Sequence, residues 1–219
     1  MTMQMARGSR TRTANMNKRR QSILKCAGEI IASEGISALT MGRLAQGAGV
    51  TIPTVHNLFG KKHDIYEHLV LEMIQKVEQA LSTLEVSDPI SAAETFVDKM
   101  HEVFREDETL YKAAFIAGEN TKIFDQKLPG GIFQTSLNVC RDICETALEK
   151  GYLLGRINSE LLAFHIFSSQ RLARQDWVNG YITLPEYRRQ VLQGIFITFL
   201  SDTTDSYKDK LHEKLSTLV

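Results

Sequence analysis

The spacing of apolar residues along most of this chain predicts α-helices. Between Lys18 and Ser33 apolar side chains recur at steps of three and four residues, and Gly35 follows as a helix stop. A longer stripe of the same kind runs from Lys62 to Leu84, far enough to join two domains. No segment has the alternation of a strand. We therefore expect an all-α fold, with further helices over residues 88–104, 109–117, 133–149, 159–179, 184–201 and 206–218.

Two of the predicted helices are short and closely spaced. Residues 40–48 and 52–58 have helical patterns, and Gly49 and Val50 separate them. Thr40 and Thr51 precede the two segments and have the side chains typical of N-caps. This arrangement predicts a helix-turn-helix, a motif whose second helix enters the major groove of DNA.

The residues of this predicted motif divide into two faces. Small or apolar side chains are expected to lie between the two helices, namely Leu44, Ala45, Ala48, Val50, Val55 and Phe59. Pro53 suits the first turn of the second helix, where its missing N–H costs little. The side chains left to face DNA are Thr51, Ile52, Thr54, His56 and Asn57.

The net charge of zero conceals two unlike parts of the chain. Residues 1–62 contain ten Lys and Arg residues and two acidic ones, a net charge of +8, whereas residues 63–219 have a net charge of −8. A basic end on an acidic body suggests a polyanionic partner that touches one end. A basic face that is merely solvated is the alternative on charge alone.

The first 17 residues lack an apolar period, and we expect them to form a disordered basic tail. Arg7, Arg10 and Arg12 are candidates to reach into the minor groove beside the helix-turn-helix, as basic arms do. A leader that contacts nothing is the other possibility.

Composition narrows the class of protein. The chain has 219 residues, 43% of them hydrophobic, without an apolar run long enough for a membrane span or a signal peptide, so we expect a globular cytoplasmic protein. Cys26, Cys140 and Cys144 form no CxxC pair, which indicates reduced thiols and neither disulfides nor a zinc site. Cys140 and Cys144 are one helical turn apart, and their apolar neighbours favour core positions over redox sensing.

No motif for catalysis is visible. The sequence contains no phosphate-binding loop, no cluster with metal-ligand spacing and no GxSxG nucleophile elbow. We therefore expect neither an enzyme nor a protein with a metal or cofactor.

The segment GRLAQGAGVTIPTVHNLFGKKHDIY resembles the signature of the tetracycline-repressor (TetR) family of regulators. The elements that carry the resemblance are Gly35, Leu44-Ala45, Ala48-Gly49-Val50, Thr54-Val55, Phe59 and Lys62, within a match from Lys18 to about Leu69. Two residues depart from the pattern. His56 stands where the family usually has a tyrosine that contacts the phosphate backbone, and Pro53 replaces a small residue of the recognition helix.

The resemblance implies roles for particular residues. Thr40 and Lys62 would bind phosphate, and residues 51–57 would present groups to bases and backbone. His56 could donate to phosphate in a pH-dependent way. The complete set expected at the DNA is Thr40, Arg43, Thr51, Ile52, Pro53, Thr54, His56, Asn57, Lys61 and Lys62.

The resemblance also implies that a second domain, residues 63–219, binds a small molecule and dimerises through its last two long helices. Gly194 permits close approach of these helices, and Thr183 with Glu186 forms a capping-box pair before the second one. For Gln170 and Arg171 we favour a dimer interface or solvent over a pocket. Most aromatic residues should be ordinary core, and the candidates to line an effector pocket are Phe104, Phe115, Phe133, Phe167, Arg171 and Trp177.

These observations favour a dimeric DNA-binding repressor that a small, lipophilic effector releases from an inverted-repeat operator. The alternative is a helix-turn-helix protein that a protein partner or DNA occupancy regulates without an effector. The domains are expected at residues 1–17 (tail), 18–62 (DNA binding) and 63–219 (effector binding and dimerisation).

Overall fold

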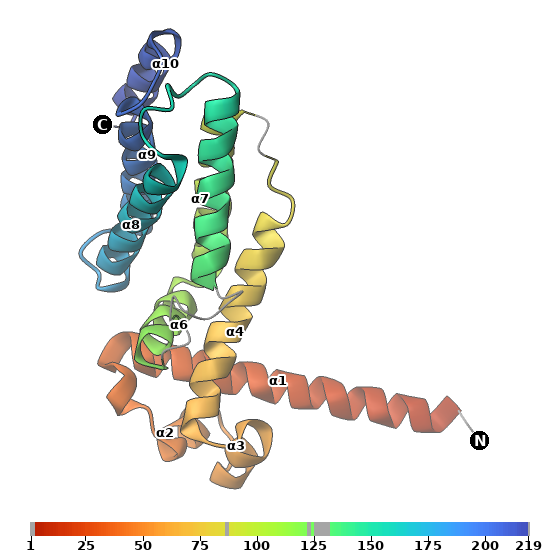
Figure 1. The fold of residues 1–219 in the computed structure, drawn as a ribbon. Helices are drawn as coiled ribbons and strands as arrows, with labels where there is room; N and C mark the ends of the chain where they lie inside the picture. Colours follow the sequence, from red (N-terminus) through yellow and green to blue (C-terminus); the bar gives the residue numbers. More distant parts are fainter. Residues whose placement is uncertain (1–2, 86–87, 122–123, 125–131, 219) are drawn as a thin grey trace. The chain divides into compact units, whose positions relative to one another are not determined.

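The all-α prediction is confirmed by a computed structural model that describes residues 3–85, 88–121, 124 and 132–218, although the side chains of residues 3–11, 132 and 133 lie outside this description (Figure 1). Within these ranges there are no strands, and a single isolated bridge pairs Leu153 with Thr203. The helices are α1 (Met3–Glu34), η1 (Ile36–Ala38), α2 (Met41–Gly47), α3 (Ile52–Phe59), α4 (Lys62–Leu81), α5 (Pro89–Glu106), α6 (Glu108–Thr121), α7 (Ile132–Glu149), α8 (Ser159–Val178), α9 (Leu184–Leu200) and α10 (Asp205–Ser216).

The first helix differs from the sequence prediction. Residues 3–17 continue α1 toward the N-terminus, where we had expected a disordered tail. Extending an existing helix by one residue costs far less than starting a new one, and Met, Gln, Ala and Arg are good helix formers. The packed segment after Lys18 therefore acts as the nucleus from which the helix extends.

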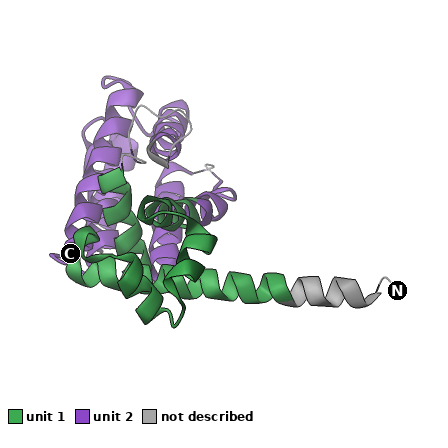
Figure 2. Cartoon of the chain, turned by 90° about the horizontal axis from the view of Figure 1, so that it is seen from below, with its two compact units in different colours: residues 1–74, 107–123 green, residues 75–106, 124–219 purple. Residues whose placement is uncertain are grey.

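The chain folds into two compact units (Figure 2). Unit 1 comprises residues 1–74 and 107–123, and unit 2 comprises residues 75–106 and 124–219. From the sequence we expected a domain boundary at residue 62. In the structure, the first part of α4 and all of α6 lie in the same unit as the helix-turn-helix. Helix α4 thus contributes residues to both units.

Unit 1 is built around α1. Its apolar stripe is buried, with Ile23, Ala27 and Ile31 fully inaccessible to solvent. Helix α6 packs against α1 where Gly28 lies beside Leu110, and a Cβ on this glycine would stand 3.2 Å from the leucine Cδ1. A distant segment of the chain therefore completes the core of unit 1.

Unit 2 contains α5 and α7–α10, with α8 and α9 side by side (Figure 1). The predicted close approach at Gly194 is confirmed, because a Cβ there would stand 3.0 Å from the Ser169 Cβ. The predicted capping box at the start of α9 is confirmed too: Thr183 N–H donates to Glu186 Oε2 at 2.7 Å, and Glu186 N–H donates to Thr183 Oγ1 at 3.3 Å.

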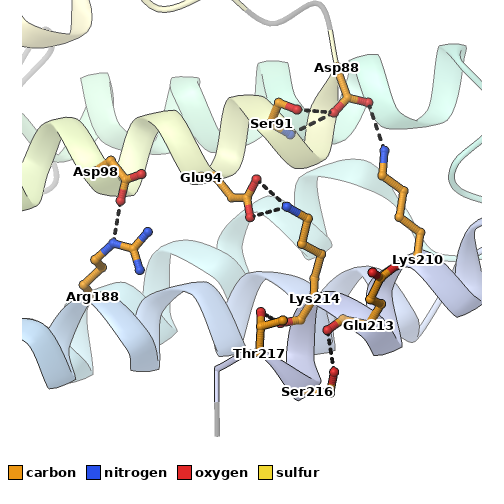
Figure 3. Close-up of polar contacts among 10 residues, drawn as sticks. All are labelled: Asp88, Ser91, Glu94, Asp98, Arg188, Lys210, Glu213, Lys214, Ser216 and Thr217. Carbon is orange, nitrogen blue, oxygen red and sulfur yellow. Dashed lines mark hydrogen bonds and ion pairs between the residues drawn. The ribbon is translucent and has the colours of Figure 1, made fainter.

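Carboxylates along α5 tie this helix to α9 and α10 (Figure 3). Lys214 Nζ donates to both oxygens of Glu94, at 2.7 and 2.9 Å, and Arg188 Nε donates to Asp98 at 2.5 Å. Asp88 caps α5 by accepting from the N–H of Ser91 at 2.9 Å, and Lys210 Nζ lies 3.9 Å from its carboxylate. The Tyr152 hydroxyl also donates to Asp88.

The hydrogen bonds at Asp88 change its acidity. Partial burial alone would raise the pKa of this carboxyl group, but the hydrogen bonds from Tyr152 and Ser91 outweigh burial and lower the pKa from 3.8 to about 2. A pKa that is lower in the folded state than in the unfolded state contributes stability above the unfolded value. This stability is lost as the pH falls from 3.8 through about 2.

We predict that Tyr152→Phe lowers the free energy of unfolding at neutral pH by about 1 kcal/mol, because Asp88 loses one charge-assisted hydrogen bond. The difference from wild type should shrink as the pH falls from about 4 through about 2, because Asp88 becomes protonated over this range, first in the unfolded state and then in the folded state. Urea unfolding followed by circular dichroism at several pH values measures it. Tyr181→Phe, at a tyrosine that is 77% exposed, is the matched control. An equal loss at about pH 6 and about pH 2.5 would show that the tyrosine does not act through the carboxylate.

Candidate DNA interface

Two capped helices and a tight turn form the core of the interface. The Thr40 hydroxyl accepts from Arg43 N–H at 3.2 Å, and the Thr51 hydroxyl accepts from Thr54 N–H at 3.4 Å, so both predicted N-caps are confirmed. Gly49 has φ of 65°, a left-handed conformation that glycine adopts without strain. Val50 N–H then donates back to Ala45 C=O at 2.9 Å and closes the turn.

The predicted inner face of the motif is largely confirmed. Leu44, Ala45, Val55 and Phe59 are buried, whereas Ala48 and Val50 are half-buried. Gly47, which the sequence analysis did not single out, lies against α1. A Cβ at this position would stand 2.4 Å from Cys26 Sγ, so α2 can approach α1 this closely only with glycine there. Burial raises the pKa of the Cys26 thiol, which fits a packing role.

The predicted outer face of α3 is open to solvent. The residues Thr51, Ile52, Pro53, His56 and Asn57 are exposed, and Thr54 is half-buried. The two threonine hydroxyls lie 2.9 Å apart, so each fixes the orientation of the other. Hydroxyl, amide and imidazole groups on one exposed helix face are able to bind base edges and phosphates.

His56 has one of its two ring nitrogens engaged. Nδ1 lies 2.8 Å from the carbonyl oxygen of Gly60, and because a carbonyl only accepts, Nδ1 must carry the hydrogen. In the neutral ring Nε2 is then an acceptor. A phosphate oxygen also only accepts, so His56 can donate to phosphate from Nε2 only when the ring is protonated.

The basic residues at the two ends of the motif have protein partners. Arg43 makes a bidentate ion pair with Glu34, at 2.5 and 3.0 Å, with both side chains exposed. The Lys61 N–H donates to Asp64 Oδ2 at 2.7 Å, which caps α4, and the side chain of Lys61 is exposed. Lys62 Nζ lies 5.6 Å from the ring centre of Tyr66. All three side chains remain at the surface of unit 1.

Phe59 is held by two residues that the sequence analysis missed. The Arg20 guanidinium lies 4.9 Å above the Phe59 ring, and His68 contacts the ring edge-on with centroids 5.1 Å apart. Arg20 also lies 2.7 Å from His68 Nε2. Since these residues come from α1, α3 and α4, the cluster fixes the end of α3 against the rest of unit 1. No spacing in the sequence links positions so far apart.

The effector candidates are divided between the two units. In unit 2 Phe104 stacks on Trp177, with ring centroids 5.2 Å apart, while Phe167 is buried and Arg171 is half-buried. Phe115 is buried in unit 1, and the Phe133 side chain lies outside the described residues. Tyr187, which the sequence analysis did not select, completes the cluster at 6.0 Å from Phe104 and 5.9 Å from Trp177.

The burial of Gln170 contradicts the interface or solvent position that we preferred for this polar residue of α8. We expected an interface or solvent position, but the residue is 7% exposed within unit 2. Its side chain shares a hydrogen bond with Tyr187, whose pKa burial raises and this hydrogen bond lowers, with a net increase. Gln170 Oε1 accepts no hydrogen bond from the described residues.

The core interpretation of the paired cysteines is confirmed. Cys140 and Cys144 are buried, and desolvation raises the pKa of each thiol to about 12. Such thiols are not the reactive, low-pKa kind. The described part of the chain contains no group of three or more His, Cys, Asp or Glu side chains that could hold a metal ion. None of its helices is long and apolar enough to cross a membrane.

The capped helices, the tight turn and the exposed polar face of α3 define a helix-turn-helix DNA-binding protein. Residues 23–69 match the family model described as bacterial regulatory proteins, tetR family. The sequence resemblance to TetR-family transcriptional regulators is thereby confirmed over residues 23–69. Such regulators are transcription factors and not enzymes.

Solved structures share the fold over most of the chain. A γ-butyrolactone receptor (ArpA-like protein) aligns with a TM-score of 0.69 at 13% identity, covering 93% of this chain and 97% of that one. CprB from S. coelicolor A3(2) aligns with a TM-score of 0.68 at 14% identity, covering 91% of this chain and 97% of that one. NalD, the secondary repressor of the MexAB-OprM multidrug efflux pump in Pseudomonas aeruginosa, aligns with a TM-score of 0.67 at 16% identity. That alignment covers 88% of this chain and 99% of NalD. No curated protein matches the sequence.

We predict that His56→Leu weakens DNA binding about fivefold, because α3 loses an exposed polar group that can contact the DNA backbone. Fluorescence anisotropy of labelled DNA at constant ionic strength and pH measures the affinity. His56→Tyr, which supplies a hydroxyl group at the same position, should retain most of the affinity. His212→Leu, at an exposed histidine of α10, is the control. Wild-type affinity in His56→Leu would refute the role of this ring.

Proposed function

We propose that this regulator is a cytoplasmic, dimeric repressor that a small, lipophilic effector releases from an inverted-repeat operator. DNA binding is common to the regulators that this chain resembles. The proposal therefore concerns dimerisation, the effector, and repression rather than activation of transcription. The observation that carries the proposal is the apolar surface of α8 and α9.

The apolar surface supports a dimer. Leu161, Phe164 and Leu172 are 50%, 53% and 65% exposed, and their spacing places them on one face of α8. On the adjacent helix α9, Ile197 is 59% exposed. Large apolar side chains clustered on neighbouring helices are typical of surfaces that another protein covers. A second copy buries the same surface on both partners, as two-fold symmetry requires.

A dimer also agrees with the length of the recognition helix. Helix α3 has eight residues, so one copy reads only a few base pairs. Two copies related by a two-fold axis read two half-sites about one helical turn apart, or about 34 Å. The operator is therefore an inverted repeat in this proposal.

The polar and aromatic residues inside unit 2 support an effector. Phe104, Trp177 and Tyr187 provide an apolar environment, and Gln170 Oε1 is a buried acceptor without a described partner. A buried acceptor left unpaired costs about 1–3 kcal/mol, and a ligand that donates a hydrogen bond offsets this cost. The names of the γ-butyrolactone receptor and of the repressor NalD agree with such a role in proteins of this fold.

The chain connectivity supplies a route for release. Residues 62–74 of α4 belong to unit 1 and residues 75–81 to unit 2, so an effector that shifts unit 2 can move α4. Helix α6 lies in unit 1, although it joins α5 and α7 of unit 2. An altered spacing of the two DNA-binding heads would no longer fit the operator.

We predict that a lipophilic compound with a hydrogen-bond donor raises the melting temperature by several degrees and lowers operator affinity at least tenfold. Alkyl γ-butyrolactones with and without a hydroxyl group are the first probes, followed by compounds that co-purify with the protein. Calorimetry and DNA anisotropy measure the two effects. Gln170→Leu should lose the preference for the hydroxylated probe and keep its DNA affinity.

The alternative, regulation by a protein partner or by DNA occupancy, makes a different prediction. In that case the protein binds its operator, but no compound from the panel or from a cell extract changes the melting temperature. Such a result would contradict the effector part of the proposal and leave DNA binding intact.

A further inference from the structure

Residues 12–19 of α1 are exposed along their whole length. From residue 12 onward, where the side chains of the helix are described, the first fully buried one is Ile23, and Met16 is 43% exposed. A helical segment that is exposed on every face gains no stability from a core. A partner outside the unit is therefore the natural source of contacts for this segment.

Two grooves of unit 1 border this segment. One, of about 780 Å³, is lined by Arg12, Asn15, Met16 and Arg19 of α1 and by Thr54, Asn57 and Leu58 of α3. The other, of about 400 Å³, is lined by Asn15, Lys18, Arg19 and Ser22 of α1 and by Ala48, Gly49 and Val50 of the turn. Asn15 and Arg19 line both grooves. The segment thus borders the face of α3 that carries Thr54 and Asn57.

The orientation of this segment is fixed by the residues that follow it. Arg20 lies over Phe59 and beside His68, and Gln21 Nε2 donates to Glu72 at 3.1 Å. These contacts anchor α1 to α3 and α4 directly after Arg19. Because the helix is continuous, Arg12, Asn15 and Arg19 are presented at set positions relative to α3.

The charge of the grooves identifies the partner. Their lining includes Arg12, Lys18 and Arg19, and it includes no acidic residue. Thr54 and Asn57 belong to the helix that enters the major groove, so a molecule that reaches them also passes along α1. DNA is the polyanion that satisfies both conditions.

We propose that residues 12–19 of α1 and the outer face of α3 form one continuous DNA-binding surface, in which Arg12 and Arg19 donate to backbone phosphates. This proposal rests on DNA binding alone and not on a dimer or an effector. It replaces the minor-groove arm that the sequence suggested for Arg12. An α-helix with side chains is about 10–12 Å wide and the minor groove about 6 Å, so a helical segment binds the backbone instead.

The experiment compares salt dependence on two DNAs. The binding constant of wild type, Arg12→Ala, Arg19→Ala and the double variant is measured by anisotropy between about 50 and 300 mM salt. The DNAs are a duplex of random sequence and the duplex that the protein selects from a random pool. Lys208→Ala, which removes an exposed cation from α10, is the control. Thermal unfolding verifies that each variant is folded.

Each arginine variant should weaken binding about fivefold at about 0.15 M salt, and the double variant about thirtyfold, on both DNAs. The slope of log K against log salt should fall by about 0.9 for each lost contact, with unchanged base preference. Lys208→Ala should match wild type. Wild-type slopes and affinities in the double variant would overturn the proposal, and a changed preference for A·T pairs would assign these residues to the minor groove instead.

A second variant separates a helix from a flexible basic tail. Ala14→Pro keeps every cation but interrupts the helix between Arg12 and Arg19. We expect it to weaken binding as Arg12→Ala does, because Arg12 leaves its position beside α3. Wild-type affinity in Ala14→Pro would show that the segment does not act as a helix. If wild type itself bound neither DNA, the DNA-binding function would fail and not merely this inference.

Discussion

The position of the recognition helix depends on the packing of Phe59. Helix α3 has only eight residues, too few to be stable in isolation. Val55 and Phe59 anchor its inner face, and Arg20 and His68 enclose the Phe59 ring from α1 and α4. Every group proposed to contact DNA from α3 is placed by this cluster. The same cluster also sets the direction of α1, so both parts of the proposed DNA surface share one anchor.

The two units have complementary roles in this account. Unit 1 is basic, and its exposed polar groups face away from a small core of α1, α2, α3, α4 and α6. Unit 2 combines an ion-paired edge between α5 and α10 with an apolar surface on α8 and α9. The charged side chains of the first surface find their partners within the chain. The apolar side chains of α8 and α9 remain exposed to solvent. The proposed association of two copies through the apolar surface of α8 and α9 would account for this contrast.

The local features of the site were predictable from the sequence because they depend on neighbouring residues. Thr40 and Thr51 cap the helices that follow them, Gly49 makes the turn, and the apolar period of each helix marks its buried face. The long-range features were not predictable in this way. The contact of Arg20 with Phe59 joins residues 39 positions apart in the sequence, and α6 belongs to unit 1 although its neighbours in sequence are in unit 2.

Two further differences have the same physical origin. Gln170 is a polar residue, so composition favoured an exposed site, but its hydrogen bond to Tyr187 on another helix compensates in part for burial. Residues 3–17 lack an apolar period, yet they continue a helix whose nucleus lies farther along the chain. In both cases the residues that determine the structure are too far away in the sequence for a local pattern to include them. They are Tyr187 for Gln170, and the packed part of α1 after Lys18 for residues 3–17.

Selection of DNA from a random pool, followed by sequencing, tests the central claim most directly. The account predicts that wild type selects an inverted repeat whose half-sites lie about one helical turn apart. Leu172→Asp, which places a charge on the apolar surface of α8, should select single half-sites, whereas Leu71→Asp, at an exposed leucine of α4, should select the full repeat. Enrichment of no sequence, or of a motif without two-fold symmetry by wild type, would contradict the account.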